Sequence, residues 1–256
     1  MERKYIALAF TFFITACGTV TQPPPAQPLP TPTTSAPAAQ EPTETATAVP
    51  AVQPTAEPAT VPGSFRDDFE GSLGEGWQWR NEDAANRSLT EAPGSLQINV
   101  LGGQVSDDTI TNLLLRDAPP GDFQVETKVT VRPQANFQFA GLIVYESPQN
   151  LIQAGRAFCD APDLCVGEGL YVDHYSDGSF VSPNFATAYM EEEAYLRILR
   201  QGDTYTIQTS SDGSEWVLLG EHVSPMNPLQ IGLVAGQNTT EAIPALFDYF
   251  EVRGIP

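Results

Sequence analysis

The segment from Phe123 to Val131, FQVETKVTV, places apolar and polar side chains in strict alternation. Successive side chains of an extended chain point to opposite faces, so this alternation predicts a β-strand with one buried face and one solvated face. A strand of this kind has to cover its apolar face with another layer. The segment therefore requires a sheet packed against a second element of structure.

Further strands are expected along the rest of the chain, separated by the turn signals APGS, APPGD, SDGS, QGD and SSDG. Many short strands with frequent turns, and without alternating helices, predict an all-β, antiparallel two-sheet sandwich of the jelly-roll type. The expected strands are residues 95–100, 112–116, 137–145, 169–175, 194–200, 204–210, 215–223, 229–236 and 245–252.

One segment, ATAYMEEEAYLRILRQG, has the composition of a helix. We instead predict a polar loop through Glu193, followed by a strand that turns back through Gln201, Gly202 and Asp203. A related question arises at SSDGSEW, which is similar to the sialidase Asp-box but has one residue too few between Asp212 and Trp216. A hairpin turn at Asp212-Gly213 explains that segment without a catalytic role.

Four segments occur in the order in which one family has them: DDFEGSLGEGWQW, DFQVETKV with AGLIVY, YLRILRQGDTYTIQTSSDGSEW, and IGLVA followed by FDYFEV. From Phe65 to Val252 the chain resembles the concanavalin A-like jelly roll at the C-terminus of family 43 glycoside hydrolases such as β-xylosidases. These motifs are short and degenerate. The resemblance implies the fold, and it leaves the ligand open.

The N-terminus is organised as a secretory signal. Arg3 and Lys4 precede a short apolar run that ends at Ala16, too short to span a bilayer. Residues 14–17, Ile-Thr-Ala-Cys, resemble the bacterial lipobox, which implies cleavage after residue 16 and acylation of Cys17. An ordinary secretory signal with an incidental cysteine is the alternative. The expected location is the bacterial cell envelope, with the chain held on the membrane by Cys17 and facing outside the cytoplasm.

Residues 17–63 are expected to form a disordered linker. The 46 residues after Cys17 include 12 Pro, 10 Thr and 9 Ala, and they contain no aromatic residue and no Lys or Arg. Such a composition buries too little apolar surface to offset the conformational entropy of ordering. The expected domains are therefore a signal peptide over residues 1–16, an anchor and linker over 17–63, and the sandwich over 64–256.

The chain is strongly acidic, with a formal net charge of −20 at pH 7. A phosphate backbone would be repelled, so nucleic acid is excluded as a partner. Cys159 and Cys165 lie six positions apart, and we predict that they form a disulfide in an exported chain. A metal site is the alternative, although two cysteines alone do not complete a zinc ligand set.

No catalytic pattern accompanies the fold. The E-x-D-x-E strand of laminarinase-type glucanases is absent, and no nucleophile elbow or H-E-x-x-H motif is present. We therefore predict a non-enzymatic module that requires no cofactor. The prediction is a carbohydrate-binding, lectin-like surface module that acts as a monomer. A module for protein interaction or envelope scaffolding is the alternative, and a glycoside hydrolase ranks below both.

The candidate glycan site is the segment LYVDHY. Tyr171, Asp173 and Tyr175 alternate onto one face of a strand, with Val172 and His174 on the other. Aromatic rings and carboxylates are the groups that recognise sugars, so we name Tyr171, Asp173, Tyr175 and His174 as candidates. The alternative is that the aromatic rings belong to the core and the polar groups lie at the sheet edge.

A structural Ca²⁺ is also considered, because jelly-roll carbohydrate modules often hold one where the first and last strands meet. Here the candidate ligands are Asp67, Asp68 and Glu70 near the first strand and Asp248 on the last. These four carboxylates would have to converge if the terminal strands pair. Alternatively, Asp248 lies at the sheet edge without a metal.

Overall fold

A computed structural model describes residues 63–161, 165–227, 230–237 and 240–256. The predicted signal peptide, Cys17 and all of the predicted linker except Gly63 lie outside the described residues. In the described part of the chain, none of the helical structure is long and apolar enough to cross a membrane. That helical structure is a 3₁₀ turn at Ala84–Asn86.

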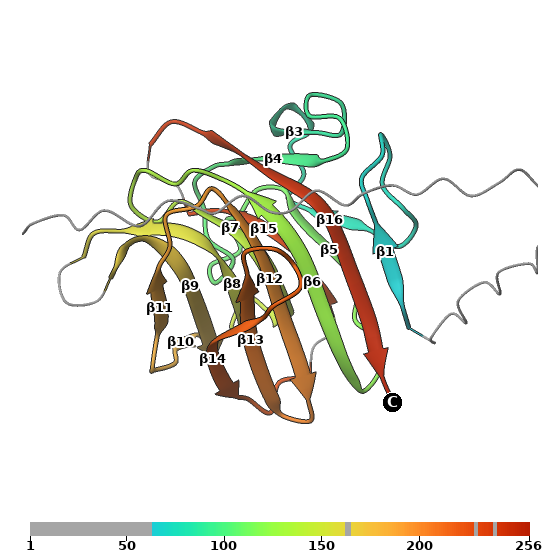
Figure 1. Cartoon of the computed structure of the whole chain (residues 1–256), viewed down its shortest axis with the longest axis vertical. Coiled ribbons are helices and arrows are strands. Elements are labelled where there is room, and N and C mark those ends of the chain that lie inside the picture. The colour runs from blue at the N-terminus through green and yellow to red at the C-terminus, as the bar shows by residue number, and fades with distance from the viewer. Residues whose placement is uncertain (1–62, 162–164, 228–229, 238–239) are drawn as a thin grey trace, which may run out of the picture. The chain divides into compact units, whose positions relative to one another are not determined.

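Two antiparallel sheets form the domain, as the alternation of the sequence predicts (Figure 1). In the first sheet the strands run in the order β14-β13-β12-β6-β16-β4-β3, and β1 also pairs with β16. Their bounds are β1 Phe65–Asp67, β3 Arg87–Ser88, β4 Leu96–Val100, β6 Asp122–Thr130, β12 Glu193–Gln201, β13 Thr204–Ser210, β14 Val217–Val223 and β16 Ile243–Ile255.

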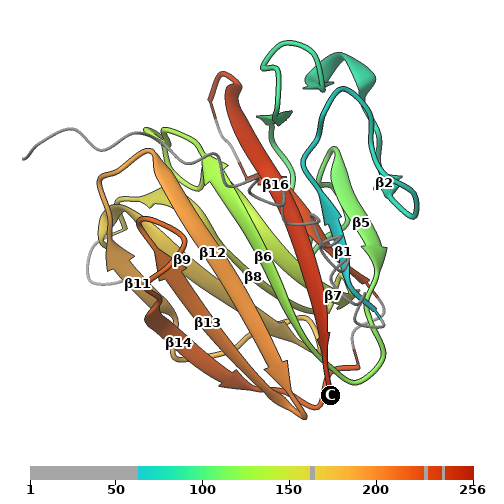
Figure 2. The same ribbon diagram turned by 45° about the vertical axis from the view of Figure 1, so that its right-hand side comes forward.

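The second sheet runs in the order β10-β9-β8-β7-β15-β5-β2, and β11 also pairs with β9. The two sheets lie face to face in the turned view (Figure 2). The strand bounds are β2 Gln78–Arg80, β5 Leu113–Asp117, β7 Phe139–Ser147, β8 Asn150–Cys159, β9 Gly167–Ser176, β10 Ser179–Phe180, β11 Phe185–Ala188 and β15 Gln230–Gly236.

The main hydrophobic core lies between the sheets and is built from alternate residues of their strands. On β6, Phe123, Val125 and Val129 are fully buried, as the period of two predicts. They face the inner side chains of the second sheet, such as Leu142 of β7 and Leu233 of β15. A second apolar cluster covers the outer face of the second sheet, so several strands of that sheet are buried on both faces.

The expected strands and turns are confirmed, but the short strands β3, β10 and β11 were missed as well as β8, and β11 lies within the segment predicted as a polar loop through Glu193. The segment that could be read as a helix forms β12, which turns through residues 201–203 and pairs with β13. β8 was not predicted from the sequence. Its burial pattern runs without alternation from Leu151 to Ala157, because both of its faces are covered, and its sequence therefore lacks the period of two.

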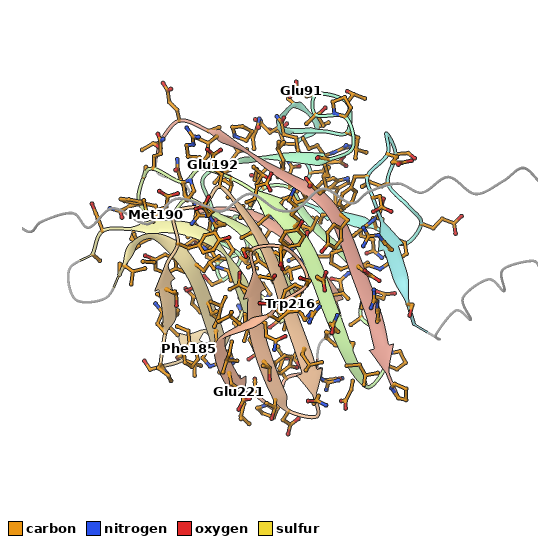
Figure 3. The ribbon with its side chains drawn as sticks, viewed as in Figure 1. Glu91, Phe185, Met190, Glu192, Trp216 and Glu221 are labelled. Atoms are coloured by element: carbon orange, nitrogen blue, oxygen red, sulfur yellow. A yellow bond between two sulfur atoms is a disulfide. The ribbon has the colours of Figure 1, made fainter. Side chains whose placement is uncertain are left out.

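The SSDGSEW segment is a turn, as predicted. Gly213 has a φ of +77°, and the Asp212 carboxylate accepts the backbone N–H groups of Ser214 and Glu215. Trp216 lies on the outside of the first sheet, where the Arg197 guanidinium is 3.5 Å from the centre of its ring (Figure 3). The described residues that line the pocket on the second sheet include none from this turn.

Candidate functional site

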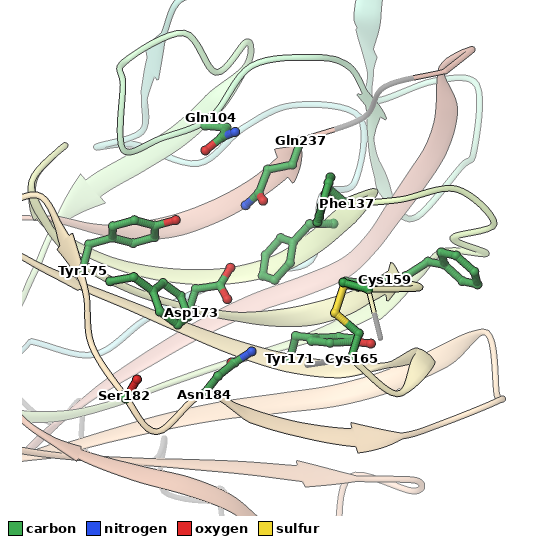
Figure 4. A pocket seen from close by; sticks show the side chains of 15 residues that line it. Gln104, Phe137, Cys159, Cys165, Tyr171, Asp173, Tyr175, Ser182, Asn184 and Gln237 are labelled. Atoms are coloured by element: carbon green, nitrogen blue, oxygen red, sulfur yellow. A yellow bond between two sulfur atoms is a disulfide. The ribbon is translucent and has the colours of Figure 1, made fainter. Parts of the chain in front are cut away.

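A pocket of about 710 Å³ lies on the outer face of the second sheet, at the end where β8 and β9 meet the disulfide (Figure 4). β9 supplies its floor, because the period of two places Tyr171, Asp173 and Tyr175 outside while Leu170 and Val172 enter the core. The lining is Gln104, Phe137, Phe139, Ala157, Phe158, Cys159, Ala161, Cys165, Tyr171, Asp173, Tyr175, Phe180, Ser182, Asn184 and Gln237.

Aromatic rings form much of the pocket wall. Phe137 and Phe180 are 49% and 45% exposed, which is high for phenylalanine, and both line the pocket. The Tyr175 ring meets the Phe180 ring edge to face, with centroids 5.4 Å apart. Exposed ring faces around a hollow can stack on the apolar faces of a small ring-shaped ligand.

Asp173 is the polar centre of the pocket. Gln153 Nε2 donates to Asp173 Oδ2 at 2.9 Å, and the side chain of Gln237 donates to the same carboxylate. The carboxylate points into the pocket toward Gln237 (Figure 4). Loss of hydration raises the pKa of Asp173, and the two amide donors partly oppose that rise.

The residues around Asp173 come from distant parts of the chain. Gln237 follows β15, and its backbone N–H donates to Gly103 O at 2.9 Å, which holds the segment carrying Gln104 over the sheet. Gly103 has a φ of +96°, and a Cβ there would lie 2.2 Å from Thr109 O, so the close approach requires glycine. No local sequence pattern indicates that the segments carrying Gln104 and Gln237 lie side by side.

The predicted disulfide is confirmed and forms one rim of the pocket. Cys159 and Cys165 are joined, with Cα atoms 5.4 Å apart. In the chain-entropy estimate a loop of this size contributes about 2 kcal/mol to stability. Tyr171 braces the same hairpin, because its hydroxyl accepts from Val166 N at 3.0 Å and donates to Gly167 O at 2.7 Å.

The structure divides the four predicted glycan-site residues. Tyr171, Asp173 and Tyr175 line the pocket, but Tyr171 is only 5% exposed and its hydroxyl is already used by the hairpin. The placement of His174 in the site was wrong. The side chain points between the sheets, where its ring lies 4.7 Å from that of His222 on β14, centroid to centroid.

The four predicted calcium ligands do not converge. Asp67 is buried and accepts from Phe69 N, Gly74 N and Trp77 Nε1 at 2.8–2.9 Å, so protein donors surround its carboxylate. Asp68 pairs with Arg66, and Asp248 pairs with Lys128 at 2.8 Å. Glu70 is exposed. Within the described ranges no group of three or more His, Cys, Asp or Glu could hold a metal ion, so these residues do not fit a calcium ion.

Comparison with known families identifies the family to which this fold belongs. Residues 66–253 match the family described as the beta xylosidase C-terminal concanavalin A-like domain. The chain belongs to this family. The resemblance identified from the short sequence motifs is therefore confirmed, as is the antiparallel sandwich. No curated protein sequence matches the chain.

Solved structures share the fold of this concanavalin A-like domain. The family 43 protein BlXynB of Bacillus licheniformis matches with a TM-score of 0.65 and 20% identity, over 74% of this chain and 39% of that one. The xylan beta-1,4-xylosidase of Bacillus halodurans C-125 matches with a TM-score of 0.63 and 20% identity, over 73% and 38%. The beta-glucanase of Bacillus licheniformis matches with a TM-score of 0.52 and 14% identity, over 75% and 99%.

The domain thus spans about two fifths of the two family 43 proteins that it matches. The family model describes the C-terminal domain of such enzymes. The activities in the names of these proteins belong to the whole enzymes. At these levels of identity the likeness shows the fold alone.

Proposed function

We propose that this chain is a lipid-anchored, non-catalytic carbohydrate-binding module of the bacterial cell envelope. The observation that carries the proposal is the pocket on the outer face of the second sheet. It combines exposed aromatic rings with a carboxylate and the amides of Gln104, Asn184 and Gln237. Aromatic faces for the C–H surface of a sugar, and planar polar groups for its hydroxyls, are what sugar recognition requires.

The same pocket supports a non-catalytic role. Glycoside hydrolysis generally uses two carboxyl groups on opposite sides of the bond that is cleaved. Asp173 is the one Asp or Glu among the described residues that line the pocket. With a single carboxylate, the pocket has the means to hold a sugar and lacks the pair needed to cleave its glycosidic bond.

Glycan binding can be measured with the purified full-length chain in detergent, against a panel of neutral and acidic polysaccharides. We expect binding to at least one glycan, and a loss of about tenfold or more in affinity for Tyr175→Ala and for Phe137→Ala, because each removes a stacking face. Trp216→Ala is the matched control: it removes an aromatic ring from the opposite sheet and should leave affinity unchanged. Absence of binding to every glycan would overturn the proposal.

The membrane anchor rests on the lipobox resemblance at residues 14–17 and on the linker composition that follows it. Two or three acyl chains contribute about 0.8 kcal/mol per buried CH₂ group, enough for firm attachment. We therefore expect Cys17→Ser to move the chain from the membrane fraction to the soluble fraction of an expressing bacterium. Cys159→Ser with Cys165→Ser is the control, and should stay with the membrane. A membrane-bound Cys17→Ser chain would refute acylation at this residue.

A protein-interaction role is the second candidate, and one feature favours it. β14 is an edge strand of the first sheet that exposes three apolar side chains. Val217, Leu218 and Val223 are 63%, 60% and 71% exposed. Exposed apolar residues on a sheet edge are typical of protein contacts. This role would take first place if no glycan binds.

A further inference from the structure

We infer that the pocket selects neutral sugars, holding two neighbouring hydroxyl groups of one sugar unit on the Asp173 carboxylate, and that it rejects acidic sugars. The inference rests on the proposed function, and it names the class of glycan that the site takes. Three properties of the pocket support it: the charge of the lining, the hydrogen-bonding capacity of Asp173 and the way in which Gln153 holds that carboxylate.

The pocket offers no positive charge to a ligand. Among the fifteen described residues that line it, none is Lys, Arg or His, and Asp173 is the one acidic residue. A sugar carboxylate placed against these walls would lose part of its hydration without gaining a cationic partner. The strongly acidic chain also repels an acidic sugar at longer range. Neutral sugars meet no such penalty.

Asp173 can accept more hydrogen bonds than the described residues give it. A carboxyl group has several acceptor positions on its two oxygens, and the amides of Gln153 and Gln237 occupy two of them. Two adjacent sugar hydroxyls are spaced to reach the two oxygens of one carboxyl group.

Gln153 holds the carboxylate in place at a cost to folding. Gln153 lies directly opposite Asp173 across the β8–β9 pair, and it is 1% exposed. While Nε2 donates to Asp173, Oε1 remains buried without a hydrogen-bond partner. A buried oxygen without a hydrogen-bond partner destabilises the folded chain. Holding the Asp173 carboxylate for a ligand accounts for this arrangement, with Gln153 as a positioning residue.

The test compares two oligosaccharides that differ only in charge: a neutral glucose oligomer and its glucuronate counterpart of the same linkage and length. Both are titrated by calorimetry into the full-length chain in detergent. If glucose oligomers do not bind, the best neutral glycan of the panel replaces the neutral oligomer. We expect the neutral oligomer to bind about tenfold or more tightly than its acidic counterpart. This comparison uses the unmodified chain, so it does not depend on the folding of a variant.

A substitution assigns the selectivity to Asp173. Asp173→Asn should weaken binding of the neutral oligomer by about tenfold or more and narrow the ratio between the two ligands. Asp177→Asn, the same change in the exposed turn after β9, is the control and should alter neither. Thermal melting establishes that each variant is folded.

The outcomes separate the two proposals. Binding of neither oligomer, nor of any other glycan, would overturn the proposed function itself. Equal or tighter binding of the glucuronate oligomer would overturn the rejection of acidic sugars and leave glycan binding standing. A folded Asp173→Asn chain with the affinity and selectivity of the original would show that Asp173 is not the anchor.

Discussion

Replacing Arg156 by alanine should lower the free energy of unfolding by about 3–5 kcal/mol. The Arg156 side chain is 0% exposed and lies between the sheets. Nη1 donates to Tyr189 O at 2.7 Å and to Gly169 O at 3.1 Å, and Nη2 pairs with Glu168 Oε1 at 2.5 Å. Alanine would remove the Arg156 donors from two carbonyl oxygens and a carboxylate and open a cavity beside them.

Urea denaturation of the full-length chain measures this loss, and thermal melting should show a decrease of about 10 °C. Arg132→Ala is the matched control: its side chain is 61% exposed and pairs with Glu192 at the surface, so less than about 1 kcal/mol should be lost. Arg156→Lys should fall between the two, because an ammonium keeps the charge but cannot reach all three acceptors. A loss below about 1 kcal/mol for Arg156→Ala would contradict this account.

Acid should destabilise the domain by way of the two histidines buried between the sheets. His174 and His222 are 2% and 5% exposed, and both nitrogens of His174 and Nε2 of His222 lack a hydrogen-bond partner. Burial, reinforced by repulsion from His174, lowers the pKa of His222 to about 4. Burial also lowers the pKa of His174. Both rings are therefore held neutral in the folded chain.

The direction of the pH effect follows from these shifts. At His222 the unfolded chain binds a proton below about pH 6.5, while the folded chain does so only nearer pH 4, so the unfolded state gains this proton first. Stability is full above pH 6.5 and declines as the pH falls toward 4. For His222 alone the decline should amount to about 2–3 kcal/mol by pH 4.5.

Denaturation at pH 7.5 and pH 4.5 measures the effect in the original chain and in His222→Phe. Phenylalanine keeps an aromatic ring beside His174 and Phe185, both of which contact the His222 ring edge to face, and it removes the titrating group. The loss of stability between the two pH values should be smaller in the variant by about 2 kcal/mol. Carboxylates are protonated in both chains, so their contribution to the loss of stability cancels when the two chains are compared. An equal loss in both chains would exclude His222 as the acid-sensitive group.

Part of the site could be predicted from the sequence. A period of two along residues 170–175 was sufficient to place Tyr171, Asp173 and Tyr175 on one face of a strand, because alternation is a property of any extended chain. The same rule places His174 on the opposite face, and including it among the site residues went against that rule. The disulfide was predictable as well, because its two cysteines are close in sequence.

The rest of the site depends on contacts between distant segments. Gln153 belongs to β8, which has no alternation to reveal it because both of its faces are covered. Phe137, Gln104 and Gln237 reach the pocket from three separate connections, and only the assembled sheet brings them together. For the same reason the sequence could not show that the Asp67 carboxylate, a reasonable metal ligand, accepts hydrogen bonds from Gly74 N and Trp77 Nε1 instead.

The sequence by itself determined most of the long strands, the sandwich, the family and the shared face of Tyr171, Asp173 and Tyr175, because each of these follows from local periodicity or from short motifs. Only the tertiary structure decided which face of β9 lies outside, that Gln153 and Gln237 hold Asp173, and that the calcium ligands do not meet. Those facts depend on strand order and register. Strand order is set by the packing of the whole core, and a local pattern does not encode which distant strands become neighbours.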